Sequence, residues 1–236
     1  MRGFVLLIAD IILVCTKTKS CDAAMVSHKV FCFGDSLTTG TSPPLNDDFP
    51  FAQCLEKKLR SNPAFGSALV RWKGLPGWTA SALERDGGLL GNIDQIQASV
   101  GKLDLVIILA GTTDLAYETD SEVILDAITR IHGSAHSRGV KTIAVSIPPS
   151  GWQLQSESTR MLAETVNSKL QSWTNDSGLN PQASMVTFVP FPIKQFDRSS
   201  GLWSSDGLHF SPEGYKYIGE ALATTVSNIL SETNVG

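Results

Sequence analysis

The chain alternates short, continuously apolar runs with longer amphipathic segments. Five runs rich in Val, Ile and Phe cover residues 29–33, 68–72, 103–110, 141–147 and 185–189. Continuous apolarity over this length is typical of strands that are covered on both faces, because such strands have no solvent-facing side to keep polar. The pattern therefore predicts five buried strands.

Amphipathic helices are predicted between and after these strands, over residues 48–61, 121–138, 157–173 and 212–230. We expect Asp48 and its polar neighbours to cap the first helix and Gly139 to stop the second. Ser211 as N-cap and Pro212 at the first helical position should start the last one. Strands that alternate with helices in this rhythm indicate an α/β protein with a parallel sheet and helices on both faces.

The second helix carries two further expectations. Its apolar side should present the positions Val123, Ala127, Ile128 and Ile131. His132 and His136 stand four residues apart, a spacing that can bind a metal, but no third ligand is evident. We therefore expect both histidines at the helix surface and no metal site.

Composition narrows the classes of function. The 236 residues are 42% hydrophobic and 18% charged, which suits one globular domain, and we assign residues 25–236 to it. A net charge of −4 gives no electrostatic footprint for nucleic acid, so we expect no nucleic-acid partner. No sequence feature calls for a cofactor, and the oligomeric state is left open.

The first 24 residues form a candidate signal peptide or N-terminal extension. A basic Arg2 precedes an apolar run over residues 3–15, and small residues follow at Ala23 and Ala24. The run is too short for a stable membrane span. This favours a secreted protein, with a cytoplasmic one as the alternative if translation effectively starts at Met25. The sequon that begins at Asn175 matters only for a secreted chain.

Chemistry-bearing residues follow the strands. Gly34-Asp35-Ser36-Leu37 comes directly after the first strand, at the edge of a parallel sheet where ligands bind. A serine hydroxyl needs a base within hydrogen-bond reach to act as a nucleophile. His209 is the candidate base, and Asp206, three residues earlier, can hold its imidazole in the right tautomer.

Two further loops sit at the same predicted edge. Residues 74–79, which include Gly77, follow the second strand, and Gly111-Thr112-Thr113-Asp114 follows the third. Glycines in such loops allow close backbone approach, and their N–H groups can face a ligand. For Asp35 and Asp114 we expect only local loop hydrogen bonds, and for Cys32 and Cys54 simple burial.

These four motifs in this order resemble the SGNH/GDSL hydrolase family, over nearly the whole chain from residue 29 onward. Within it, the chain resembles the branch of isoamyl acetate-hydrolysing esterases and arylesterases. The resemblance implies a three-layer α/β/α, flavodoxin-like fold with a five-stranded parallel sheet, and a catalytic triad of Ser36, Asp206 and His209. It also implies an oxyanion hole formed by the backbone N–H groups of Ser36 and Gly77 and a side chain of the third motif.

The third motif departs from the family pattern, which reads Gly-x-Asn-Asp. Thr113 stands where the family has asparagine, so a shorter hydroxyl replaces the amide donor. Losing one oxyanion donor typically lowers turnover about 100- to 1,000-fold. The expected function is a serine esterase or lipase-like hydrolase of small-molecule or carbohydrate esters. The alternatives are a weakened or inactive binding protein of the same fold, an acyltransferase, and a flavodoxin-like nucleotide binder.

Overall fold

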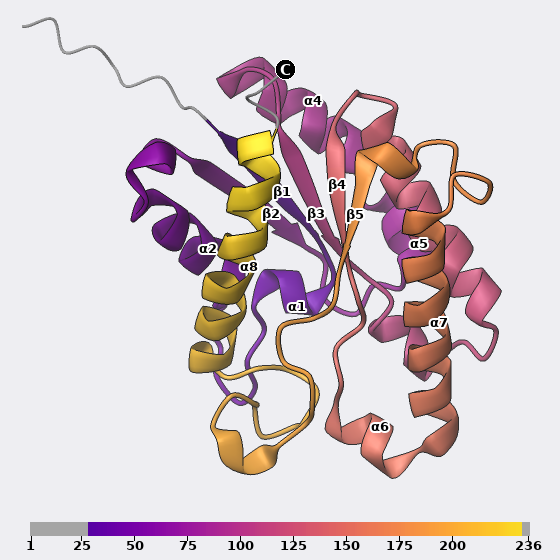
Figure 1. Ribbon diagram of the computed structural model, residues 1–236. Helices are drawn as coiled ribbons and strands as arrows, with labels where there is room; N and C mark the ends of the chain where they lie inside the picture. The colour runs from indigo at the N-terminus through magenta and orange to yellow at the C-terminus, as the bar shows by residue number, and fades with distance from the viewer. Residues whose placement is uncertain (1–27, 233–236) are drawn as a thin grey trace, which may run out of the picture.

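Five parallel strands form the centre of the computed structural model, which describes residues 28–232 (Figure 1). The strands are β1 (Lys29–Gly34), β2 (Leu69–Gly74), β3 (Leu105–Leu109), β4 (Lys141–Val145) and β5 (Val186–Val189), in the order β2-β1-β3-β4-β5. All four neighbouring pairs are parallel, which confirms the predicted fold class. The candidate leader, residues 1–24, lies outside the described residues.

Eight α-helices surround the sheet within residues 28–232. They are α1 (Ser36–Thr39), α2 (Phe51–Arg60), α3 (Ala80–Asp86), α4 (Leu89–Val100), α5 (Ser121–His136), α6 (Gly151–Gln155), α7 (Glu157–Asn175) and α8 (Pro212–Glu232). The pattern predicted α2, α5, α7 and α8, and it missed the other four. None of the helices in this part of the chain is long and apolar enough to cross a membrane.

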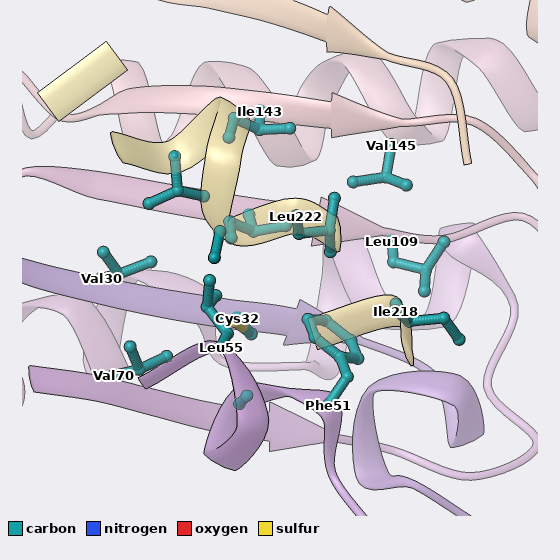
Figure 2. Close-up of a cluster of buried hydrophobic side chains, with 14 of the residues drawn as sticks. Val30, Cys32, Phe51, Leu55, Val70, Leu109, Ile143, Val145, Ile218 and Leu222 are labelled. Atoms are coloured by element: carbon teal, nitrogen blue, oxygen red, sulfur yellow. The ribbon is translucent and has the colours of Figure 1, made fainter. Parts of the chain in front are cut away.

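Alternate residues of the strands face the two helical layers. Val30 and Cys32 of β1 join a core with side chains of α2 and α8, part of which Figure 2 shows. Phe31 and Phe33 point the other way, into a second core with α3, α4, α5 and α7. Each large side chain buried in this way contributes about 1.5–3 kcal/mol. The inner strands are therefore covered on both faces, as their continuous apolar runs require. The expectation of burial is wrong for β2, which lies at the edge of the sheet and buries only Val70.

The starts of two helices test the predicted caps. α2 begins at Phe51 after Pro50, and no side chain caps it, so the predicted cap at Asp48 is wrong. Asp48 instead pairs with Thr41 in an isolated antiparallel bridge, which keeps it outside the helix. For α8 the prediction is confirmed, because Ser211 Oγ accepts the N–H of Gly214 at 3.1 Å.

Three of the four positions predicted for the buried side of α5, namely Ala127, Ile128 and Ile131, are buried as expected, and the fourth is not. Val123 is 41% exposed, whereas its neighbour Ile124 is buried with the rest of the apolar side. His132 and His136 are buried rather than at the surface, so that expectation is wrong. The reason is the hydroxyl of Thr142 on β4, which lies 2.8 Å from His132 Nδ1 and 2.9 Å from His136 Nε2.

These contacts have one consistent arrangement of protons. His136 Nδ1 lies 3.2 Å from the side-chain oxygen of Gln182, which only accepts, so Nδ1 donates and Nε2 accepts from the Thr142 hydroxyl. His132 Nδ1 then donates to the same hydroxyl oxygen. Burial, together with the neighbouring His136, lowers the pKa of His132 to about 3. Both rings are thus held neutral against the sheet.

This neutral pair predicts a loss of stability in acid. In the unfolded chain His132 has its ordinary pKa of 6.5. Between pH 6.5 and a pH of about 3, His132 is therefore protonated in the unfolded state and neutral in the folded state. Stability should fall as the pH drops through this window, by roughly 1.4 kcal/mol per pH unit for one histidine. Urea unfolding of the wild type and of His132→Phe at pH 7 and pH 4.5 measures the effect.

Between pH 7 and pH 4.5 the free energy of unfolding should fall by about 1–3 kcal/mol less in the variant than in the wild type. This difference does not depend on the stability of the variant at pH 7. Equal pH dependence in both proteins would contradict the neutral state of His132.

Candidate active site

Ser36 leaves the sheet at the carboxyl end of β1, where α1 begins (Figure 1). Asp35 is the N-cap of this short helix, and its Oδ1 accepts the N–H of Leu37 at 2.9 Å. Two glycines let the helix lie close to the strand ends. A Cβ on Gly34 would come within 2.0 Å of the carbonyl oxygen of Leu109, and one on Gly74 within 2.1 Å of Thr39 Oγ1. Backbone packing therefore fixes where Ser36 stands.

The other two candidate residues lie on one small closed loop. Trp203 and Phe210 form an antiparallel bridge, and the N–H of Ser204 donates to the carbonyl of His209 at 2.9 Å. Gly207 makes the turn of this loop with a φ of +70°, which favours glycine. The fully buried ring of Phe210 anchors the loop to the core.

Two outside contacts hold this loop over the sheet edge. The N–H of Gly151, at the start of α6, donates to the carbonyl of Gly207 at 2.7 Å. The hydroxyl of Ser204 donates to the carbonyl of Pro43, in the segment that follows α1. The loop is thereby fixed both to the start of α6 and to the segment that follows α1.

The fold brings Ser36, His209 and Asp206 into one hydrogen-bonded chain. His209 Nδ1 lies 2.6 Å from Asp206 Oδ2, and His209 Nε2 lies 2.9 Å from Ser36 Oγ. A carboxylate only accepts, so Nδ1 carries the proton and Nε2 is free to accept from the serine hydroxyl. Ser36 and His209 are 173 residues apart in sequence, and their contact depends wholly on the fold.

Asp206 is held as a carboxylate. Burial works to raise its pKa, but hydrogen bonds from the His209 ring and from the N–H groups of Leu208 and His209 outweigh burial, and the pKa lies below its usual value. The two backbone bonds measure 2.9 and 3.0 Å and both go to Oδ1, which leaves Oδ2 for the ring. The negative charge thus stays beside the histidine.

Gly77 lies in a tight turn after β2. The N–H of Trp78 donates to the carbonyl of Leu75 at 3.2 Å, and Gly77 has a φ of +78°, as a type II turn with Pro76 and Gly77 at its centre requires. Within residues 28–232 the N–H of Gly77 has no hydrogen-bond partner. This donor is therefore available to a ligand.

The loop after β3 places its two threonines differently. Thr112 is buried, and its hydroxyl has no partner among the described residues. Thr113 starts a short 3-10 helix (Thr113–Ala116) and is half-buried. Its hydroxyl likewise makes no hydrogen bond to another described residue. Thr113 therefore has a donor that no neighbour uses.

Asp114, expected to make only local bonds, reaches another segment. Its two carboxylate oxygens lie 3.0 and 2.9 Å from the N–H of Ala80, the first residue of α3. The sequence carries no signal for this contact, because α3 itself was not predicted. Gly151 was missed for the same reason, since its role depends on the position of α6.

Two tryptophans and the two cysteines of the described residues have simpler environments. Trp203 packs between Phe196 and Phe210, with ring centroids 4.8 and 4.4 Å away, so it fills the core of the loop. Trp152 lies on α6 and is 49% exposed. Cys32 is buried and Cys54 half-buried, and both are free thiols. No group of three metal-ligating side chains occurs within residues 28–232.

Comparison with solved structures finds the same fold. A GDSL-like lipase from Bacteroides thetaiotaomicron superimposes with a TM-score of 0.58 at 15% identity, over 88% of this chain and 89% of that one. A family 3 carbohydrate esterase from Clostridium thermocellum gives 0.61 at 19% identity, over 87% and 98%. A lipase from a goat rumen metagenome gives 0.59 at 16% identity, over 84% and 96%.

Comparison at the level of sequence identifies the family. A search of curated proteins found no significant match. The model of the GDSL-like lipase/acylhydrolase family matches residues 32–217, which include the strand-end serine, both Gly-containing loops and the loop with Asp206 and His209. The chain therefore belongs to the GDSL-like lipase/acylhydrolase family, also known as the SGNH hydrolases.

Proposed function

We propose that the protein is a serine esterase that cleaves carboxylic esters through an acyl-serine intermediate. The observation that carries the proposal is the pair of short contacts on either side of His209, to Ser36 at 2.9 Å and to Asp206 at 2.6 Å. A nucleophile bonded to a base, with the base oriented by a carboxylate, is the arrangement that acyl transfer needs.

In the first step Ser36 Oγ attacks the ester carbonyl while His209 Nε2 takes its proton. Asp206 stabilises the imidazolium that forms and keeps its orientation. The tetrahedral intermediate collapses with loss of the alcohol, which receives the proton from His209. In the second step His209 Nε2 takes a proton from water as the water oxygen attacks the acyl carbonyl. The second tetrahedral intermediate then collapses, and the bond to Ser36 Oγ breaks while His209 returns the proton to that oxygen and the acid is released.

The negative charge on the tetrahedral intermediate needs donors that are already in place. We assign this role to the N–H groups of Ser36 and Gly77 and to the hydroxyl of Thr113. The supporting observation is that the Gly77 N–H and the Thr113 hydroxyl have no hydrogen-bond partner among the described residues. A developing oxyanion would supply that partner.

The substrate class is a small-molecule or carbohydrate ester. The structural neighbours include a carbohydrate esterase and lipases, which supports an ester without choosing its alcohol. An acyltransferase would use the same first step and pass the acyl group to an alcohol instead of water. Product analysis with added alcohol separates the two activities.

A second candidate function is binding without efficient turnover. The observation that favours it is Thr113, whose hydroxyl stands where the family pattern has an asparagine amide. An oxyanion hole with a weak third donor binds the ground state of an ester while stabilising its transition state poorly.

The first experiment is hydrolysis of short-chain p-nitrophenyl esters by the full-length chain and by Ser36→Ala. The variant should lose roughly 1,000-fold or more in kcat, because the remaining groups cannot form the acyl intermediate. Ser134→Ala, which removes an exposed hydroxyl on α5, is the matched control and should retain wild-type activity. Equal activity in wild type and Ser36→Ala would rule out Ser36 as the nucleophile.

A second experiment tests the third donor. Thr113→Val keeps the shape but removes the hydroxyl, and it should lower kcat about 10- to 100-fold with little change in KM, because the oxyanion exists only near the transition state. Thr113→Asn restores the family donor and should raise kcat above that of wild type.

The matched control is Thr112→Val, since the Thr112 hydroxyl is buried without a partner among the described residues. Its removal should leave kcat unchanged and not lower the melting temperature. A wild-type kcat in Thr113→Val would remove Thr113 from the oxyanion hole, and inactive wild type together with inactive Thr113→Asn would favour the binding function.

A further inference from the structure

The Gly77 turn is fixed at both of its ends. At its start the N–H of Leu75 donates to the carbonyl of Gly34 at 2.9 Å, which ties the turn to β1 two residues before Ser36. At its other end the chain enters α3 at Ala80, whose N–H meets both carboxylate oxygens of Asp114 at 3.0 and 2.9 Å. Only four residues lie between the two ties, at Leu75 and Ala80, so each tie limits where Gly77 can lie.

Asp114 makes this second tie from a different part of the chain. It is almost fully buried, and it comes directly after Thr113 in the loop that follows β3. The carboxylate therefore joins the segment of Thr113 to the segment of Gly77. Burial raises the pKa of Asp114 to about 6, against the effect of the Ala80 N–H, so the group is kept in place at a cost in free energy.

Asp35 plays a similar part for Ser36. It is fully buried, and its Oδ1 caps α1 through the N–H of Leu37, while its Oδ2 has no partner among the described residues. Burial raises the pKa of Asp35 to about 7, and the charge of Asp114 adds to the rise. Two buried carboxyl groups thus stand next in sequence to Ser36 and Thr113, and each accepts an N–H at the start of a short helix.

We propose that Asp114 is a positioning residue for the oxyanion hole, which holds the Gly77 N–H in place through Ala80. The inference rests on the proposed esterase function. Asp114 touches no reacting atom in this role, and its effect passes through the backbone between residues 77 and 80. A donor that is displaced by about 1 Å loses much of its effect on the transition state.

The test compares Asp114→Ala with Thr79→Ala in the full-length chain. Thr79 is the N-cap of the same helix, and its Oγ1 accepts the N–H of Ala82 at 3.3 Å, so its removal weakens α3 without breaking the tie to Asp114. Both variants are assayed with the p-nitrophenyl ester that the wild type hydrolyses fastest, at a temperature well below both melting transitions.

Asp114→Ala should lower kcat about 10- to 100-fold with KM within about twofold of wild type, because the oxyanion contact acts in the transition state. Thr79→Ala should lower the melting temperature and leave kcat within about threefold of wild type. Asp114→Asn keeps one acceptor oxygen for the Ala80 N–H and should recover most of the lost kcat.

Equal kcat in Asp114→Ala and Thr79→Ala, or a raised KM with unchanged kcat, would overturn the positioning role. If Asp114→Ala shows no cooperative melting, Asp114→Glu decides, because the longer side chain keeps the acceptors but shifts Ala80. It should lower kcat at least about tenfold at wild-type KM, and a wild-type kcat would overturn the proposal. An inactive wild type would refute the proposed function and this inference with it. With an active wild type, the kcat values of the Asp114 variants test this inference alone.

Discussion

Close backbone packing at the end of β1 is the constraint on which the site depends. Gly34 and Gly74 leave no room for a side chain, and their bare backbone lets α1 turn off the strand and lie against its neighbours. Any residue with a Cβ at either position would push α1 outward, and Ser36 with it. Hydrogen bonds of about 3 Å tolerate little displacement, so the contact between Ser36 and His209 exists only because two strands end in glycine.

The same edge of the sheet gathers the other groups. Parallel strands have their carboxyl ends at the same edge of the sheet. Strand direction alone therefore brings the loops after β1, β2 and β3 together at that edge. The final loop reaches this edge from the start of α8, and aromatic packing of Phe210 and Trp203 sets its height above the sheet. Proximity in the site is therefore a result of strand direction, while precise placement comes from a few tight contacts.

Much of this architecture could be predicted from the sequence, and the reasons differ by element. The strands can be predicted because their residues, such as those of β3, are apolar without interruption. Ser36 could be placed at the sheet edge because its motif follows a strand, and Asp206 and His209 because they come just before the last helix. α3 and α4 were not predicted, because α3 is short and α4 contains Gly91. Neither segment therefore has a long run of apolar residues at helical spacing. The tie between Asp114 and Ala80 spans 34 residues and has no local pattern at all.

Asp206 and His209 sit on a single turn, and this has a mechanical consequence. Asp206 binds the ring and the backbone of His209 at once, so the Asp–His contact is complete within four residues. Movement of the loop leaves that pair intact and changes one distance, the gap to Ser36. Two contacts from outside hold the loop in place, the bond of Gly207 with Gly151 and the bond of Ser204 with Pro43. These two contacts therefore set the distance between the His209 ring and the Ser36 hydroxyl.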